Sequence, residues 1–217
     1  MSATEDSRVL PPLVRWAELD VDPAMLDRFA AAALELRDAV MRTEPGVVAY
    51  HAVAEAGVPG RIHVIEIYDD ADAYRAHVQS AHFLAFRSAT DGLVTERRLQ
   101  DVVAVCLASK AELAAEPLVR IAELEIDPAH CRSYEARVSA EIAESVRVEP
   151  GVLAMYAAAL ADAPSRVRFL EIYADDAAYR AHLKSPHFEL YAEATKSMIR
   201  AKRLVDTRPL FLALRTA

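Results

Sequence analysis

The amino-acid sequence predicts an α+β protein in which two tandem copies of one strand–helix–strand–strand–helix–strand unit pack sheet to sheet. Three observations support this fold class. The sequence repeats itself after 105 residues, each copy contains strand and helix patterns in that order, and one predicted strand is apolar on both of its faces. Two repeats of this length indicate two fused domains rather than a solenoid.

The repeat spans most of the chain. Residues 14–105 align with residues 119–210, with 37 identities and no gap. The longest shared phrase reads EIYDDADAYRAHVQSAHF in the first copy and EIYADDAAYRAHLKSPHF in the second. We therefore expect four segments: an N-terminal extension (1–12), a first domain (13–107), a linker (108–118) and a second domain (119–217).

Each copy begins with a strand that leads into a long helix. Residues 15–21 alternate apolar and polar side chains, and Asp22-Pro23 then favours a helix, because proline is well tolerated in the first helical turn. In the second copy the apolar side chains of this helix recur at helical spacing: Cys131, Tyr134, Val138, Ile142 and Val146. A Glu-Pro-Gly sequence ends the helix in both copies.

The remaining elements of the copy complete the unit. Residues 47–53 and 61–68 are strand-like and are separated by a glycine- and proline-containing loop, which indicates an antiparallel hairpin. Asp70 and Ser80 are suitable N-caps for two short helices. A last strand is expected near residues 98–107, which gives the ferredoxin-like order of elements.

The strand at residues 61–68 indicates how the two copies pack. Residues 62, 64, 66 and 68 point to one face and residues 63, 65 and 67 to the other, and both faces carry apolar side chains. A sheet with helices on one side only has a polar second face, so this sheet needs another cover. We expect the sheets of the two copies to cover each other, so that the chain forms by itself a dimeric α/β-barrel, an intrachain pseudo-dimer. Whether this chain pairs again as a homodimer stays open.

Composition excludes several classes of function. The formal net charge of −8 and the lack of a Lys/Arg cluster argue against nucleic-acid or anionic membrane partners, which need a basic surface. The N-terminus lacks the basic-then-apolar order of a signal peptide, and no apolar run is long enough to span a bilayer. These features predict a cytoplasmic protein.

The repeated phrase resembles one family. Glu-x-Tyr, an acidic helix start, Tyr-Arg-Ala-His and then Ser-x-His-Phe are similar to the antibiotic biosynthesis monooxygenase family, small dimeric α/β-barrel proteins that include quinol monooxygenases. The resemblance implies a cofactor-independent oxidation of a phenolic, quinol or polyketide-like aromatic molecule by O₂ in an apolar cavity. The chain contains no asparagine, so the Asn-dependent catalytic set of the best-known members does not transfer.

Four histidines are the candidate catalytic bases, because imidazole suits proton removal near neutral pH. His77 and His182 lie near the end of a short helix, and their alternative role is to cap its C-terminus. His82 and His187 follow the serine caps, and the positive end of the helix dipole favours their neutral form. Their alternative role is to pack that helix onto the strand.

The candidate substrate-binding residues are Tyr68, Tyr173, Glu66, Glu171, Trp16, Phe83 and Phe188. The glutamates could orient a histidine or pair with Arg75 and Arg180, and the structural pairing is slightly favoured, since a carboxylate on an apolar strand face needs a partner. A metal is not expected: His77 and His82 are five residues apart, unlike a helical zinc pair, and no carboxylate clusters with them in sequence.

Three functions remain open at this point. The first is a cofactor-free monooxygenase whose partners are an aromatic substrate and O₂. The second is a non-catalytic small-molecule-binding or stress-related barrel in which the histidines are caps and core polar groups. The third is an isomerase or lyase that uses a histidine base without O₂. The first copy is the better candidate for a working pocket, because Trp16, Tyr50 and His51 give it more polar and aromatic side chains.

Overall fold

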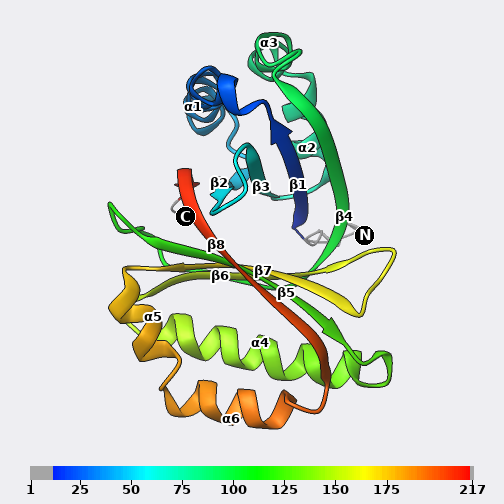
Figure 1. Cartoon of the computed structure of the whole chain (residues 1–217), viewed down its shortest axis with the longest axis vertical. Helices are drawn as coiled ribbons and strands as arrows, with labels where there is room; N and C mark the ends of the chain where they lie inside the picture. The colour runs from blue at the N-terminus through cyan, green and yellow to red at the C-terminus, as the bar shows by residue number, and fades with distance from the viewer. Residues whose placement is uncertain (1–11, 216–217) are drawn as a thin grey trace, which may run out of the picture.

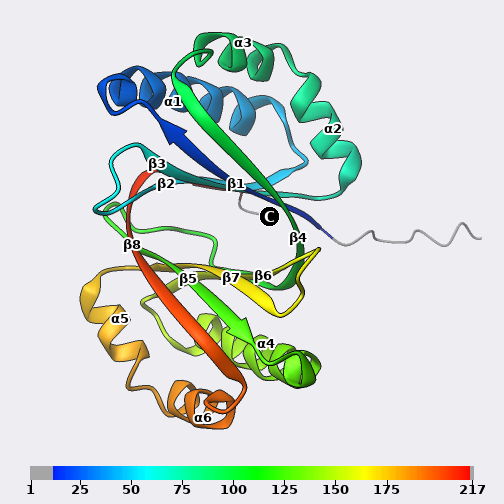
Figure 2. The ribbon, with the colours of Figure 1, turned by 45° about the vertical axis from the view of Figure 1, so that its right-hand side comes forward.

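The two copies form one closed eight-stranded antiparallel barrel (Figures 1 and 2). The structure is a computed structural model that describes residues 12–215. The strand order around the barrel is β1-β3-β2-β8-β5-β7-β6-β4. This arrangement confirms the predicted α+β class and the packing of the two sheets against each other. The expected N-terminal extension lies outside the described residues, except for residue 12.

The two halves contain matching elements. The first half consists of β1 (Leu13–Val21), a 3₁₀ turn (Pro23–Met25), α1 (Leu26–Thr43), β2 (Val47–Glu55), β3 (Arg61–Tyr68), α2 (Ala71–Gln79), α3 (Ala81–Ala89) and β4 (Val94–Ser109). The second consists of β5 (Leu118–Ile126), a 3₁₀ turn (Pro128–His130), α4 (Cys131–Val148), β6 (Val152–Leu160), β7 (Arg166–Tyr173), α5 (Asp176–His182), α6 (Pro186–Thr195) and β8 (Ile199–Leu214).

Two long strands join the halves. Residues 94–101 of β4 pair with β1 of the same half, and residues 102–109 continue across to pair with β6. In the same way β8 pairs first with β5 and then with β2. Each half therefore completes the sheet of the other. In a closed barrel no strand is left with an unpaired edge.

The helices lie on the outside of the barrel. Helices α1, α2 and α3 cover the outer face of the first sheet, and α4, α5 and α6 cover that of the second (Figures 1 and 2). Asp70 accepts hydrogen bonds from two backbone amides at the start of α2, and Ser80 accepts one at the start of α3, which confirms both predicted caps. No helix of residues 12–215 has the length and apolar character needed to cross a bilayer.

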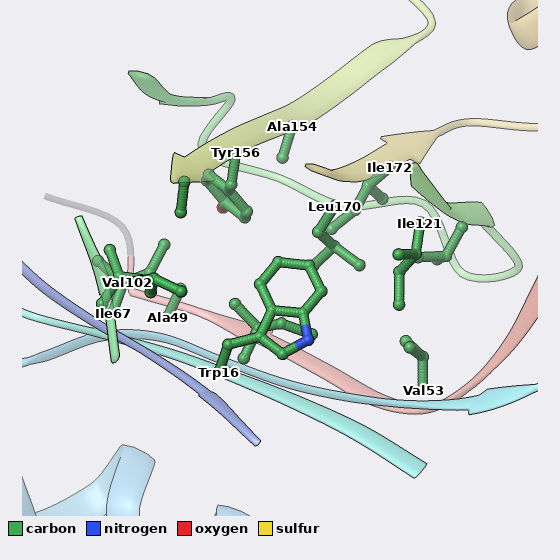
Figure 3. Close-up of a cluster of buried hydrophobic side chains, with 14 of the residues drawn as sticks. Trp16, Ala49, Val53, Ile67, Val102, Ile121, Ala154, Tyr156, Leu170 and Ile172 are labelled. Carbon is green, nitrogen blue, oxygen red and sulfur yellow. The ribbon is translucent and has the colours of Figure 1, made fainter. Parts of the chain in front are cut away.

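The barrel interior is a core to which both halves contribute. Trp16, which is 1% exposed, packs near Ile121, Leu170 and Tyr156 of the second half (Figure 3). Strand β3 shows why the sequence is apolar on both faces: Ile65 and Ile67 point into this interior, whereas alternate residues pack under the helices. Each half therefore contributes to the shared core inside the barrel and has a core of its own beneath its helices.

Candidate active sites

A cavity of about 490 Å³ lies between the first sheet and helices α1, α2 and α3. Its apolar wall is largely aromatic and includes Phe29, Tyr50, Phe83, Phe86 and Phe211. Its polar wall includes Glu66, His77, Arg15 and Arg97. Pockets that bind small molecules usually have this composition, a mostly apolar wall with a few convergent polar groups.

His77 is a buried imidazole on the wall of this cavity. The side chain is 1% exposed, and its Nδ1 lies 3.0 and 3.1 Å from the two carboxylate oxygens of Glu44. An ionised carboxylate only accepts hydrogen bonds, so Nδ1 carries the hydrogen and donates it. In a neutral imidazole the lone pair is then on Nε2. That atom has no hydrogen-bond partner and lies 4.0 Å from Glu66.

Glu66 of β3 lies near His77, and its carboxylate has a different partner from the one predicted. Its carboxylate accepts a hydrogen bond of 3.0 Å from the hydroxyl of Tyr68, and burial raises its pKa. The expected ion pair with Arg75 was wrong. Arg75 is on the exposed face of α2 and pairs with Asp72 one turn away, and Arg180 similarly pairs with Asp176 in the second half.

His82 reaches the same carboxylate from the first turn of α3. Its Nε2 bonds to Glu44, and its side chain is 24% exposed and lies outside the cavity wall. Glu44 therefore joins two imidazoles that are 33 and 38 residues away in the sequence. Sequence reasoning missed this residue because the Glu-Pro-Gly sequence was assigned only to the end of a helix. Its presence in both copies was the signal that pointed to a second role.

The same cluster contradicts one premise used against a metal. Ligand atoms of Glu44, His77 and His82 lie within 4.8 Å of one another, so a carboxylate does cluster with the two histidines. A comparable group in the second half consists of Glu141, His182 and His187. Imidazole and carboxylate are common zinc ligands. In the first group both imidazoles hydrogen-bond directly to the carboxylate, so the three side chains also satisfy one another without a metal ion.

The second half repeats the arrangement around a smaller cavity of about 320 Å³. His182 Nδ1 and His187 Nε2 lie 2.8 and 2.7 Å from one oxygen of Glu149. The hydroxyl of Tyr173 donates to Glu171 at 3.1 Å, and burial raises the pKa of that glutamate. The geometry of the first site is therefore preserved by the duplication.

The second cavity is more polar and more crowded. Glu141 of α4 takes the position that Leu36 has in α1, and it lies 3.7 Å from His182 Nε2. Burial raises the pKa of Glu141, which accepts a hydrogen bond from Ser145. Phe169 replaces the smaller Val64 on the sheet. The Nε2 atom of His182 thus faces the carboxylate of Glu141 on α4. In the first half the equivalent residue is Leu36, so His77 has no such carboxylate from α1.

The predicted site residues divide into three groups. Seven of them line a cavity through their side chains: Glu66, His77 and Phe83 in the first half, and Glu171, Tyr173, His182 and Phe188 in the second. His82, His187 and Tyr68 are not on a cavity wall. Tyr68 bonds to Glu66, which is, and His82 and His187 bond to the glutamates that hold His77 and His182. Trp16 borders the first cavity, yet its indole ring points into the barrel interior (Figure 3).

Solved structures share this fold over almost the whole chain. A proposed monooxygenase from Lactobacillus acidophilus is similar with a TM-score of 0.91 and 21% identity, covering 96% of this chain and 98% of that one. A second proposed monooxygenase, from Fusobacterium nucleatum, gives 0.84 and 18% over 95% of both chains. An anthrone oxidase-like protein gives 0.59 and 8%, covering 95% of this chain and 94% of that one. At these identities the likeness is one of fold.

Comparison with curated proteins finds no match. The family model for antibiotic biosynthesis monooxygenase, in contrast, matches twice, at residues 12–89 and 117–194. Both matches begin at the first strand of a half and end with its last helix, and both include the carboxylate and the two histidines described above. The chain therefore belongs to the antibiotic biosynthesis monooxygenase family and contains two of its domains in tandem.

Proposed function

We propose that the protein is a cofactor-independent monooxygenase that oxidises a phenolic, quinol or polyketide-like aromatic molecule with O₂ in the first cavity. One observation carries this proposal. The Nε2 atom of His77 is buried, has no partner and belongs to a side chain on the wall of an aromatic cavity, while Glu44 holds the other ring nitrogen. A carboxylate that orients an imidazole is a recurrent arrangement for a general base.

The cavity can support each step of this reaction. Nε2 of His77 takes the phenolic proton, and the resulting phenolate donates electrons to O₂. The oxygen adds to the ring as a peroxide, whose O–O bond then breaks. One oxygen atom remains on the ring as the new quinone carbonyl, and the other leaves as water with the proton returned by His77 and a hydrogen lost from the ring carbon. A cavity that excludes water protects the phenolate and the peroxide.

Neighbouring side chains favour an electron-rich aromatic guest. Arg15, Arg87 and Arg97 are the cationic groups of the cavity wall, and Arg15 also pairs with Asp101. Such groups can stabilise a phenolate oxygen. The rings of Phe83 and His77 lie 4.8 Å apart, and those of Phe29 and Phe86 5.9 Å apart, so flat aromatic surfaces surround the space. Family membership and the fold shared with an anthrone oxidase-like protein also support this substrate class.

Oxygen uptake tests the proposal. The protein is mixed anaerobically with a panel of hydroquinones and phenolic polycyclic ketones and then exposed to air. We expect uptake above the uncatalysed rate for at least one compound. His77→Gln should lower that rate by about 100-fold or more, because the general base is lost. His182→Gln, the equivalent change in the second half, is the matched control and should retain most of the activity.

The other outcomes identify the alternative functions. If no panel member consumes O₂ and a compound still binds, the protein is a non-catalytic barrel. If a compound is converted at the same rate without O₂, a histidine-based isomerase or lyase is indicated. Equal activity of the His77→Gln variant and the unmodified protein would contradict the assignment of the base.

A further inference from the structure

One end of the barrel is closed by charged side chains from both halves. In the first half these charges are matched. His63 lies 3.2 Å from Glu55, Arg61 donates to Asp20 at 2.6 Å, and Arg98 bonds to Glu18 and Asp20. His63, Arg61 and Arg98 therefore each have a carboxylate partner from a neighbouring strand.

The equivalent positions of the second half have fewer carboxylates of their own, although Glu55 of the first half bonds to Arg203 across the two halves. Arg168 occupies the position of His63, but Leu160 stands where Glu55 would supply a carboxylate, and Ala201 stands in place of Glu96. The second half thus gains a cation and lacks two anions relative to the first. The duplication provides the comparison, because the backbone of the two sites is the same.

Arg168 shows the consequence of this imbalance. Its Nη1 atom is buried and has no partner, and its Nη2 atom is 3.3 Å from Glu123. That carboxylate is shared with Arg203, whose Nη1 donates to it at 3.1 Å. The side chain of Arg168 is only 11% exposed, and burial lowers its pKa. A buried guanidinium with unused donors is costly unless an anion accepts from it.

A cavity of about 200 Å³ lies beside this guanidinium. Its charged lining consists of four basic side chains, Arg166, Arg168, Lys202 and Arg203, and two carboxylates, Glu123 and Glu125. The lining therefore has two positive charges in excess, in a protein whose net charge is −8. The planar fork of arginine matches the oxygens of a phosphate group, which carries up to two negative charges.

We propose that this cavity binds a phosphate-type oxyanion, with Arg168 as its central donor. The cavity has room for the free ion or for the phosphate group of a small monoester. Glu123 holds Arg168 from one side, and Arg166, Lys202 and Arg203 supply the further positive charge. The site adjoins the second histidine cavity, with which it shares Leu124 and Lys202 as lining residues. It is absent from the first half, where Glu55 already occupies the equivalent acceptor position.

Calorimetric titration of the full chain with inorganic phosphate, at constant ionic strength set by sodium chloride, tests this site. We expect one saturable binding event. Leu160→Glu places a carboxylate where the first half has Glu55 and should weaken phosphate binding at least tenfold by competing for Arg168. Arg168→His installs the first-half residue and should do the same. Leu190→Glu, which adds the same charge on the exposed face of α6, should bind as the unmodified protein does.

Several results would overturn the proposal. These are the absence of saturable binding to the unmodified chain, or binding by Arg168→His and Leu160→Glu that equals the unmodified affinity. Circular dichroism checks that each variant is folded, and the two variants are independent of each other. A parallel titration with glycerol phosphate separates the two sources: tighter binding than inorganic phosphate identifies a monoester ligand, and weaker binding identifies the free ion.

Discussion

At the residue scale, both candidate active sites depend on a glutamate that connects two helices to the end of a third. Glu44 follows α1 directly, and its carboxylate holds His77 from α2 and His82 from α3. Glu149 does the same in the second half. The network fixes the orientation of His77, while Leu36 leaves Nε2 free of a helix carboxylate in the first half only. The duplicated chain therefore has one apolar and one polar version of the same site.

Sequence reasoning found the histidines but not their carboxylate. The repeated phrase contains His77 and His82 within six residues, whereas Glu44 is 33 residues before His77 and joins it only after the sheet and helices pack. The predicted partner of Glu66, Arg75, failed for a related reason. Spacing along α2 was compatible with contact, but that side chain lies on the solvent face of the helix. Long-range contacts of this kind are not encoded in local patterns.

His51 gives a prediction for the pH dependence of stability. The side chain is completely buried against Tyr156, and burial lowers its pKa from 6.5 to about 3. Below pH 6.5 the unfolded chain takes up a proton that the folded chain refuses, so stability falls until the pH reaches the folded-state pKa. We expect a loss of roughly 2–3 kcal/mol between pH 7 and pH 4.5 from this residue.

The variant His51→Phe should remove this contribution while keeping the stacked ring. Urea unfolding at pH 7 and at pH 4.5 measures the two stabilities, and the difference between them should be smaller in the variant than in the unmodified protein. His130→Ala, at an exposed position, is the control and should leave the difference unchanged. Equal pH dependence of His51→Phe and the unmodified protein would show that His51 is protonated in the folded state.

At the scale of single elements, the sequence predicted most boundaries well. Strand β3 has the expected bounds, and the caps at Asp70 and Ser80 are those that a short polar side chain before a helix favours. Strand β4 begins earlier than expected. Its first residues, from Val94, are largely polar and exposed, so the sequence pattern did not identify them as part of a strand. Their pairing with β1 determines that they form a strand, and no apolar alternation marks them.

The hairpin between β2 and β3 provides a matched pair of glycines. Gly60 has φ +86°, and a Cβ there would lie 2.1 Å from the carbonyl oxygen of Val21. Gly57 has a similar φ of +80° but nothing within 4 Å. We expect Gly57→Ala to cost about 1 kcal/mol through backbone conformation alone. Gly60→Ala should cost clearly more, at least about 2 kcal/mol, because β1 must move away.

Thermal or urea unfolding of the two variants separates these effects. Both substitutions remove the same conformational freedom from the unfolded chain, so their difference reports the contact with Val21. That backbone also donates a hydrogen bond of 2.9 Å to the carbonyl of Gly60. Equal destabilisation of the two variants would indicate that the hairpin relaxes away from β1 without cost.

At the scale of the whole molecule, the internal repeat and the two-faced strand β3 were sufficient to predict the pairing of two sheets. The predicted dimeric α/β-barrel within one chain is confirmed. The route by which the barrel closes was not predicted. It depends on residues 102–109 of β4 and 207–214 of β8, which leave their own half and pair with the other. Within one copy these residues read as the end of an ordinary strand. Only the presence of the second sheet decides where they pair.

This exchange of strands predicts that the two halves stay together without a covalent connection. A protease site inserted between Ala115 and Glu116, in the exposed part of the segment joining β4 to β5, allows the folded chain to be cut. We expect the cut protein to elute from a gel-filtration column as one particle of unchanged size and to separate into two fragments only in denaturant. The shared interior around Trp16 and the pairings of β4 with β6 and β8 with β2 provide the attachment.

An insertion in the β2–β3 loop, cut in the same way, is the control for damage caused by cleavage itself. Separation of the halves in native buffer would show that the connecting segment, rather than strand exchange, holds the barrel closed.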